Sequence, residues 1–443
     1  MKIFKYIAVF MVFVLVTGCE DYFGDNANVD PDNPTTATAN VLLPQVQARL
    51  AYTWGGDLTR YFGINTQHVD GIGRQFAVLG QYGIQPNDVD NVWSNLYSGG
   101  MSSNRQMIAA AEAGGFNHYV ALGKVMEAWA LMMATDAWGD IPYSDAFELV
   151  DSEGNIKQPT LDSQESIYNS IFTLLDDARG LLGQGNGGNP PGGDDLFYGG
   201  DVDAWVACCN VLEARAQLHL SKRNGDAYSR VLAALNKGGF ADASGEFAFK
   251  FGSNANENAP WYQYIEQRDD CEVGAFYTGL LASLNDPRAP VYGFEHAVPG
   301  HPVFTPDQNL QILSYTEQEF MRAEALMGTG DSAGAYDAYL AAIASSFSDA
   351  GVDGYDDYVG QPTVGVGAGN ISMEDIMTQK YLALYTSPEL FNDWRRTGMP
   401  ALTPISGTQI PRRLPYAELE QFSNPNIPSP ATISIYDRVW WDQ

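Results

Sequence analysis

Residues 316–343 read TEQEFMRAEALMGTGDSAGAYDAYLAAI, and this stretch indicates most clearly how the chain folds. Apolar side chains recur at helical spacing on both sides of a short interruption at residues 329–330. Thr316 followed three residues later by Glu319 is the pattern of a capping box, which predicts that the first helix begins there. We therefore predict two helices, 316–328 and 331–347, that are joined by a short loop and pack antiparallel.

The same helical period dominates the chain from residue 41 onward. Pairs of helices of about 34 residues, with Ala and Tyr at packing positions, resemble tetratricopeptide units. We predict a mainly α fold of tetratricopeptide-like helical pairs with long irregular loops and little β structure, in a single domain over 41–443. The other predicted helices cover 41–53, 91–113, 118–138, 163–182, 201–223, 226–237, 372–386 and 387–396.

Long irregular segments separate the helices, and they are rich in Gly, Pro and Asn but also in aromatic residues. Loops of this length in a compact domain usually carry function or cover the core. We therefore expect a binding site among them. They cover 55–90, 139–162, 183–200, 240–310 and 397–443.

The N-terminus has the pattern of an exported, lipid-anchored protein. Two lysines precede the apolar run 7–16, which is far shorter than the roughly 20 residues that a helix needs to span a bilayer. The following VTGC, which ends at Cys19, resembles the bacterial lipobox. Residues 1–18 are therefore predicted to be a signal peptide, Cys19 the lipidated mature N-terminus, and residues 19–40 a flexible polar tether. The alternative is an ordinary signal peptide with a chance cysteine.

Composition limits the classes of ligand that the chain can bind. The 443 residues carry a formal net charge of −30, so the protein repels nucleic acids and other anionic polymers at long range. Neutral ligands are easier to accommodate.

Cys208 and Cys209 lie in a helical pattern and are expected to be small core residues. The alternative is a disulfide bond between one of them and Cys271.

The sequence lacks the motifs of metal sites and of common enzymes. Five histidines show no zinc spacing, no G-x-S-x-G elbow is present, and the glycine-rich segment 183–201 lacks the Gly-Lys-Ser/Thr of a phosphate-binding loop. Counting carboxylates cannot exclude a glycosidase, but such a pair usually needs a barrel or sandwich rather than helical repeats. Asn28, Asp30 and Asp32 imitate the start of a calcium loop, but the Gly and Glu that such a loop needs are missing, which favours Asx turns. We predict a protein that is not an enzyme and needs no cofactor or metal.

An ordered set of motifs resembles one known family. The motifs are TDAWGDIPYSDAF at 135–147, FYGGDVDAWVACCNVLEAR at 197–215, LNDPRAPVY at 284–292, SYTEQEFMRAEALMGTGD at 314–331 and YLALYTSPELFNDWRRTGMPAL at 381–402. Together they are similar to the SusD/RagB-like outer-membrane nutrient-binding lipoproteins, specifically the divergent second SusD-like subfamily. The chain departs from the family pattern at Cys208–Cys209 and at Met399, which look like core variation.

The resemblance implies a function outside the cell. Such a protein is anchored by lipid to the outer membrane, faces the cell surface, captures an oligosaccharide or peptide, and delivers it to a TonB-dependent, SusC-like transporter. A neutral oligosaccharide fits the acidic composition best, and a peptide is the alternative ligand. The same predicted helices allow an alternative interpretation, in which the protein is a helical-repeat scaffold lipoprotein that binds only protein partners.

Several arginines of these motifs are expected to stabilise the fold rather than to contact a ligand. Arg215 lies on a mostly apolar helix, which predicts an acidic partner. Arg395 and Arg396 offer planar guanidinium groups to buried carboxylates or carbonyls.

Candidate ligand-binding residues are aromatic and polar side chains in the long loops, because sugar faces stack on rings while hydroxyls need hydrogen-bonding groups. The loops 68–88 and 256–270 combine both kinds of side chain, and Trp54 follows a predicted helix. An exposed aromatic platform in these loops favours the nutrient-binding reading, and loops buried against the body favour the scaffold. The predicted residues are Trp54, Asp70, Arg74, Gln75, Tyr82, Trp261, Tyr262 and Arg268.

Overall fold

The computed structural model describes residues 37–148, 150, 155–268, 270–292 and 304–443. The chain divides into two units, Met1–Thr38 and Ala39–Gln443, and the fold below is that of the second. The predicted signal peptide, Cys19 and nearly all of the predicted tether lie outside the described residues. Within the described ranges, no helix combines the length and apolar character needed to cross a membrane.

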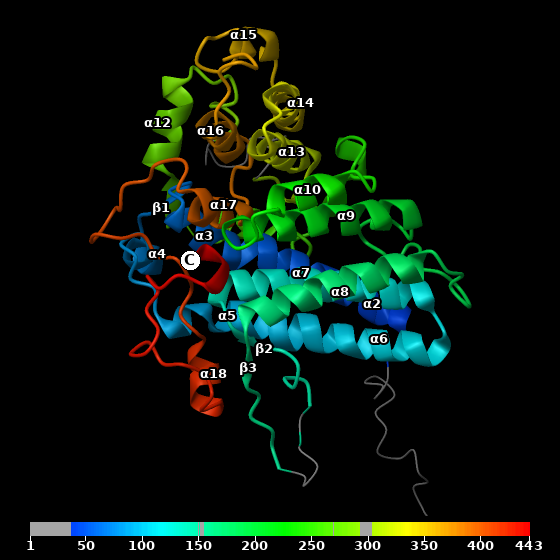
Figure 1. The fold of residues 1–443 in the computed structure, drawn as a ribbon. Helices are drawn as coiled ribbons and strands as arrows, with labels where there is room; N and C mark the ends of the chain where they lie inside the picture. The colour runs from blue at the N-terminus through cyan, green and yellow to red at the C-terminus, as the bar shows by residue number, and fades with distance from the viewer. Residues whose placement is uncertain (1–36, 149, 151–154, 269, 293–303) are drawn as a thin grey trace, which may run out of the picture. The chain divides into compact units, whose positions relative to one another are not determined.

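The unit Ala39–Gln443 is mainly α-helical with little β structure, as predicted (Figure 1). Its first helices are α2 (Ala39–Thr53), α3 (Thr59–Asn65), α4 (Arg74–Leu79), α5 (Asp90–Ser94), α6 (Ser103–Gly114), α7 (Asn117–Trp138), α8 (Gln164–Leu182), α9 (Val202–His219) and α10 (Ala227–Leu235). The later helices are α11 (Pro260–Gln267), α12 (Ala275–Ser283), α13 (Tyr315–Thr329), α14 (Ser332–Ala350), α15 (Tyr355–Val359), α16 (Met373–Ala383), α17 (Glu389–Thr397) and α18 (Glu418–Ser423).

Shorter segments of π or 3-10 helix connect some of these elements. Two are π-helical, η1 (Trp54–Leu58) and η3 (Asn95–Ser102). The η1 segment follows α2 directly, and Gly56 at its centre has non-helical dihedral angles, so the chain kinks there. The 3-10 segments are η2 (Pro86–Val89), η4 (Leu220–Lys222), η5 (Ala243–Gly245) and η6 (Trp440–Asp442).

Consecutive helices pack side by side. Helix α7 contacts α6 and α8, α8 contacts α9, and α9 contacts α10, which in turn reaches α13 (Figure 1). From Tyr119 onward, nearly every side chain of α7 is buried, which follows from its apolar character on all sides. The sequence places this helix at the centre, and the structure agrees.

The pair predicted from residues 316–343 is present as α13 and α14, which pack against each other. The predicted capping box is wrong. Ser314, rather than Thr316, caps α13, and its Oγ accepts a hydrogen bond from the backbone N–H of Glu317 at 3.0 Å. The Thr316 hydroxyl turns instead toward α14, where it donates to Asp349 Oδ2 at 2.8 Å. Gly330, with φ of 90°, ends the helix.

In the part of the chain that the structure describes, the strands form three two-stranded antiparallel sheets. Strand β1 (Val69–Gly71) pairs with β5 (Cys271–Val273), β2 (Ile141–Pro142) with β3 (Leu161–Asp162), and β4 (Phe247–Lys250) with β6 (Asn309–Leu313). The β1–β5 and β4–β6 sheets tie together segments that lie far apart in the sequence. The three cysteines among the described residues, Cys208, Cys209 and Cys271, are buried and free.

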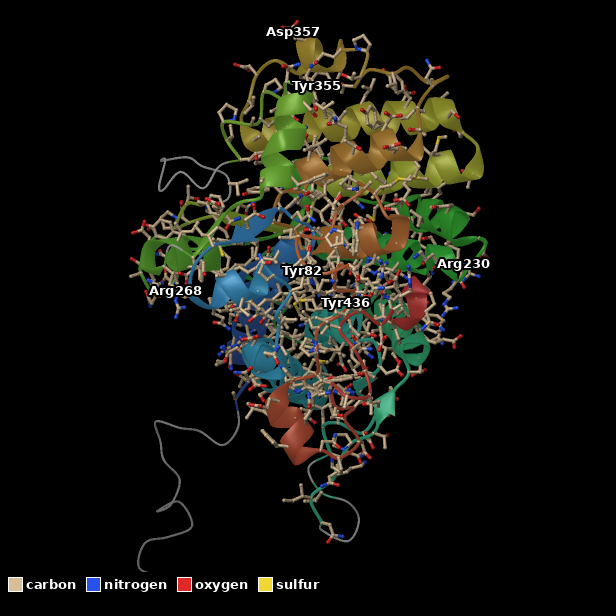
Figure 2. All side chains as sticks on the ribbon, turned by 90° about the vertical axis from the view of Figure 1, so that its left-hand side faces the viewer. Tyr82, Arg230, Arg268, Tyr355, Asp357 and Tyr436 are labelled. Atoms are coloured by element: carbon tan, nitrogen blue, oxygen red, sulfur yellow. The ribbon has the colours of Figure 1, made fainter. Side chains whose placement is uncertain are left out.

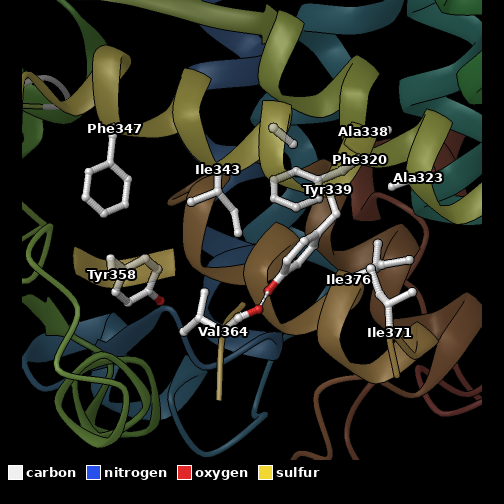
Figure 3. Packing of buried hydrophobic residues seen from close by; sticks show 11 residues of the cluster. Phe320, Ala323, Ala338, Tyr339, Ile343, Phe347, Tyr358, Val364, Ile371 and Ile376 are labelled. Carbon is white, nitrogen blue, oxygen red and sulfur yellow. Dashed lines mark hydrogen bonds between the residues drawn. The ribbon is translucent and has the colours of Figure 1, made fainter. Parts of the chain in front are cut away.

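A hydrophobic cluster fills the space between α13, α14 and α16 (Figure 3). Phe320, Tyr339 and Ile376 are buried there from one helix each. The Tyr339 hydroxyl donates a hydrogen bond at 2.9 Å to the backbone carbonyl of Val364, which Figure 3 marks with a dashed line. The buried hydroxyl therefore ties the loop after α15 to the helical pair.

Replacing Tyr339 by Phe should lower the free energy of unfolding by about 1 kcal/mol, because the buried Val364 carbonyl loses its donor while the ring stays. Urea unfolding followed by circular dichroism measures the change. Tyr336→Phe on the same helix is the matched control, since Tyr336 is only half-buried, and it should cost less than about 0.5 kcal/mol. Equal losses in the two variants would contradict this account of the hydroxyl.

Buried charges connect the helices below this cluster. The acidic partner predicted for Arg215 is Glu317 in the first turn of α13: Arg215 Nε donates to Oε1 at 2.8 Å and Nη2 to Oε2 at 2.6 Å. Arg396 pairs with Glu324 and also donates to Asp393 at 2.8 Å. Both arginines are buried, so each pair joins two helices in a region that water does not reach.

His219 lies between two carboxylates in the same layer. Its Nε2 is 2.6 Å from Glu389 Oε1, and its Nδ1 is 3.2 Å from Asp136 Oδ2. Burial lowers the pKa of His219, but Glu389 and Asp136 more than offset this effect and raise it to about 9. The imidazolium form therefore joins α7, α9 and α17 at neutral pH.

Candidate ligand-binding site

The two loops predicted to bind ligand meet in the structure. Strand β1 from the first loop pairs with β5 at the end of the second, with Asp70 opposite Glu272. The pairing continues beyond the strands, because the backbone N–H groups of Ile72 and Gly73 both donate to the Asp270 carbonyl oxygen. Helices α4 and α11 also touch through the rings of Phe76 and Tyr264, whose centroids are 5.2 Å apart. One surface therefore contains both predicted segments.

Two predicted arginines share one buried carboxylate on this surface. Arg74 Nη1 lies 3.0 Å from Asp270 Oδ1, and Arg268 Nη1 lies 3.7 Å from Asp270 Oδ2. The Asp270 side chain is 2% exposed, whereas those of Arg74 and Arg268 are 64% and 48% exposed. Figure 2 shows Arg268 projecting from the edge of the molecule. The guanidinium groups are thus anchored at one edge and keep donors free for solvent or ligand.

The other polar residues predicted in the first loop have partners of their own. Gln75 Nε2 donates to Asp88 Oδ1 at 2.6 Å, and Asp70 Oδ2 accepts from the backbone N–H of Ala275 at 2.9 Å. Asp70 therefore caps the start of α12. Tyr262, on α11, is half-buried.

Tyr82 lies below the surface rather than on it. Its side chain is buried, and its hydroxyl accepts a hydrogen bond from the backbone N–H of Ile405 at 3.2 Å. Burial raises the pKa of Tyr82. Its φ of 61° is in the left-handed region, which non-glycine residues seldom adopt. Figure 2 shows Tyr82 close to Tyr436, on the side of the molecule that faces the viewer.

The two predicted tryptophans line a cavity of about 610 Å³ beside this surface. Trp54 is the first residue of η1, and Trp261 is in the first turn of α11. Their side chains are 4% and 1% exposed, so the rings form the wall of a cavity, and the exposed aromatic platform expected from the sequence is wrong for both. Burial of these rings would by itself favour the scaffold, so the case for ligand binding depends on the cavity. Arginines lie over both rings: Arg215 Cζ is 5.4 Å from the Trp54 centroid and Arg60 Cζ is 5.7 Å from that of Trp261.

Polar residues that the sequence did not single out complete the wall. Exposed Asp307, Asn309 and Lys250 stand where the cavity opens to solvent. Deeper residues are Gln311 on β6, Glu246 just before β4 and Asp349 near the end of α14. The β4–β6 pairing brings Glu246 and Gln311 together, and Asp349 comes from α14, so no local pattern in the sequence predicts this set of residues. The cavity offers hydrogen-bonding groups beside two large aromatic rings, a combination suited to sugars.

Burial changes the acid–base behaviour of the deeper carboxyl groups. Burial, followed by the nearby charge of Asp349, raises the pKa of Glu246 to about 8. Glu246 also accepts hydrogen bonds from the backbone N–H of Tyr315 at 2.7 Å and from Gln311 Nε2 at 2.9 Å. Burial likewise raises the pKa of Asp349. Among the described residues, no three His, Cys, Asp or Glu side chains come together as metal ligands would.

A second cavity of about 640 Å³ lies between η3, α6 and α18. Its rings are engaged with one another: Trp93 stacks on Tyr97 with centroids 4.5 Å apart, and Tyr97 donates to the Pro142 carbonyl at 2.9 Å. Arg105 covers the ring of Phe147 at 4.3 Å. The first cavity is lined by the predicted residues Trp54 and Trp261, whereas none of the predicted residues lines the second. We therefore place the candidate site at the first cavity and the adjoining surface.

Comparison with known proteins agrees with the resemblance in the sequence. The family model described as "Starch-binding associating with outer membrane" matches residues 31–302 and 295–417. No protein with a curated description matches the chain.

Several solved structures share the fold. A SusD/RagB family protein from Bacteroides thetaiotaomicron is 23% identical, with a TM-score of 0.73 over 92% of this chain and 99% of the other. A SusD-like protein of Bacteroidetes AC2a is 20% identical, with a TM-score of 0.75 over 92% of this chain and all of the other. A structure described as a chitin-binding protein is 22% identical, with a TM-score of 0.73 over the same shares of the two chains. At these identities the structures show a common fold, whereas the family model covers most of the chain. The chain therefore belongs to the second SusD-like family, whose members are described as starch-binding and associated with the outer membrane.

Proposed function

We propose that this protein is a non-enzymatic, lipid-anchored lipoprotein of the cell surface that binds an oligosaccharide nutrient and delivers it to a TonB-dependent, SusC-like transporter. Membership of the family supports nutrient binding at the outer membrane. The lipobox-like VTGC at Cys19 supports the lipid anchor. The net charge of −30 favours a glycan without negative charge over an anionic one.

The observation that carries this proposal is the cavity between Trp54 and Trp261. Apolar faces of a sugar ring pack against indole rings, and its hydroxyl groups exchange hydrogen bonds with amide and hydroxyl side chains. Such groups are present at the cavity mouth and in its depth, at Asn309, Gln311 and Ser387. The similarity in fold to a chitin-binding protein also supports an oligosaccharide ligand. The arginines Arg74 and Arg268 on the adjoining surface would contact a longer chain that leaves the cavity.

Blocking the cavity with Ala243→Trp should weaken glycan binding by at least about tenfold. Ala243 is exposed and lines the cavity, so an indole there occupies ligand space without disturbing the core. Native gel electrophoresis against a panel of immobilised neutral glycans, followed by calorimetry on the best one, measures the loss. We avoid Trp261→Ala because emptying a fully buried tryptophan site costs several kcal/mol of stability by itself.

Ala241→Trp is the matched control, since Ala241 is exposed in the same segment but does not line the cavity. It should bind like the wild type. Equal binding by both variants would move the site away from the cavity. If the wild type binds peptides and no glycan, the peptide-binding alternative replaces the oligosaccharide. If it binds neither, a scaffold that contacts only proteins becomes the better account.

A further inference from the structure

Two carboxyl groups in the cavity have no cationic partner among the described residues. Glu246 accepts hydrogen bonds from Tyr315 and Gln311, and Asp349 accepts one from Thr316. The cavity's own lysine, Lys250, lies 3.5 Å from Asp307 at the mouth. By contrast, another carboxylate on the wall, that of the buried Glu317, is paired with Arg215 at 2.6 Å.

The two unpaired groups repel each other when both are ionised. The charge of Asp349 adds to burial in raising the pKa of Glu246 to about 8, so a proton held by Glu246 relieves the repulsion at neutral pH. A ligand cation would relieve it equally well. A positive group that entered the cavity would be attracted by both carboxylates, because neither has a cationic partner among the described residues and both are withdrawn from full contact with water.

A second feature of the same wall points to a ligand with acceptor groups. Trp54 is 4% exposed and lines the cavity, and its indole Nε1–H has no hydrogen-bond partner among the described residues. A buried donor without an acceptor is unfavourable, and native proteins seldom retain one without a function. A ligand hydroxyl would supply the acceptor.

We propose that the cavity recognises an amino sugar with a free amine, whose ammonium group lies between Glu246 and Asp349 and whose hydroxyl groups face Trp54 and the amide side chains. The inference rests on the proposed function and narrows its ligand class: the oligosaccharide is uncharged along most of its length but carries at least one ammonium group. A hydroxylated ring is favoured over a simple amine because Gln308, Asn309 and Ser387 offer further hydrogen bonds on the same wall.

The test compares a glucosamine oligomer with its fully N-acetylated counterpart of the same length and linkage, by calorimetry at slightly acidic pH. The wild type should bind the free-amine oligomer at least about tenfold more tightly. Because the bound ammonium replaces the proton of Glu246, binding should release a proton, and the measured enthalpy should change with the ionisation enthalpy of the buffer. Asp349→Asn and Glu246→Gln, which keep the shape of the side chains, should each reduce the preference to less than about threefold.

Asp337→Asn is the control for net charge, since Asp337 is exposed on the same helix as Asp349. It should retain the full preference. Equal binding of the two oligomers would overturn the amino-sugar inference while the proposed function stands. The inference would also be wrong if Asp337→Asn weakened the preference for the free-amine oligomer as much as Asp349→Asn does. The attraction would then come from the acidic surface as a whole and not from the cavity. Absence of binding to these oligomers and to every neutral glycan would instead overturn the proposed function.

Discussion

Replacing Arg215 by Met is expected to lower the free energy of unfolding by about 3–5 kcal/mol, because the Glu317 carboxylate then stays buried without its partner. Arg215 is fully buried and donates twice to Glu317 and once to the Ile312 carbonyl oxygen at 2.6 Å. Burial lowers the pKa of Arg215, but Glu317 and Glu389 more than offset this and raise it, so the guanidinium stays charged. Urea unfolding at neutral pH measures the loss.

Two further variants separate the buried pair from surface charges in general. Arg230→Met removes a pair with Asp226 in which both side chains are more than half exposed, and it should cost less than about 1 kcal/mol. Arg230 is at the molecular surface in Figure 2. The double variant Arg215→Met, Glu317→Leu should recover part of the stability, because no uncompensated carboxylate remains. An Arg215→Met loss no greater than that of Arg230→Met would show that the buried pair does not join α9 to α13 as described.

The second large effect concerns pH. The pKa of His219 is raised to about 9 in the folded protein, above the ordinary value of 6.5. Its contribution to stability is therefore fully present below pH 6.5 and is lost as the pH rises through 9. Between neutral pH and about pH 10 the wild type should lose roughly 2–3 kcal/mol through this group. Unfolding in urea at several pH values measures the loss.

His219→Gln isolates the contribution of this one residue. The variant should be less stable than the wild type at neutral pH, and the difference should shrink as the pH rises, because glutamine does not titrate. Glu246 also has a raised pKa, and its own contribution to stability is lost between pH 4.5 and about pH 8. Because Glu246 is present in both proteins, this loss cancels in the difference. His118→Gln, at a half-buried histidine whose Nε2 contacts the Gln184 carbonyl oxygen, is the control. A difference between the wild type and His219→Gln that stays constant with pH would contradict the imidazolium assignment.

Helices with strong patterns could be predicted nearly to the residue. The segment 118–138 is observed as Asn117–Trp138, and 163–182 as Gln164–Leu182. The segment 91–113 was predicted as one helix, but the structure divides it into α5, η3 and α6. The π-helical stretch Asn95–Ser102 shifts the side chains relative to an α-helix, and a periodicity argument does not detect such a change.

The residue that caps a helix was harder to predict than the presence of the helix. At α13 both Ser314 and Thr316 are suitable caps, and only the position of α14 decides which hydroxyl turns toward the backbone. Asp349 draws the Thr316 hydroxyl away, so Ser314 caps the helix. The residue that caps α13 thus depends on a contact between residues more than 30 positions apart, although capping looks like a local property of the sequence.

The candidate site could be predicted only in part. Aromatic and polar composition identified the two loops, and the β1–β5 pairing brings them together. Composition does not indicate how deeply a side chain is buried, so Trp261 and Tyr82 were expected on an exposed aromatic platform, but both are buried. Whether these residues bind ligand stays a prediction. Glu246 and Asp349 could not be found from sequence, because a turn and a helix end meet there only after the chain has folded.

The most direct test of the central claim is a crystal structure of the protein with the oligosaccharide that binds it best. This account predicts sugar density in the cavity, with a ring against Trp54 or Trp261 and a polar group of the sugar within hydrogen-bonding distance of Glu246 or Asp349. Sugar density at the Trp93–Tyr97 cavity or elsewhere on the body, with the first cavity free of sugar, would contradict it.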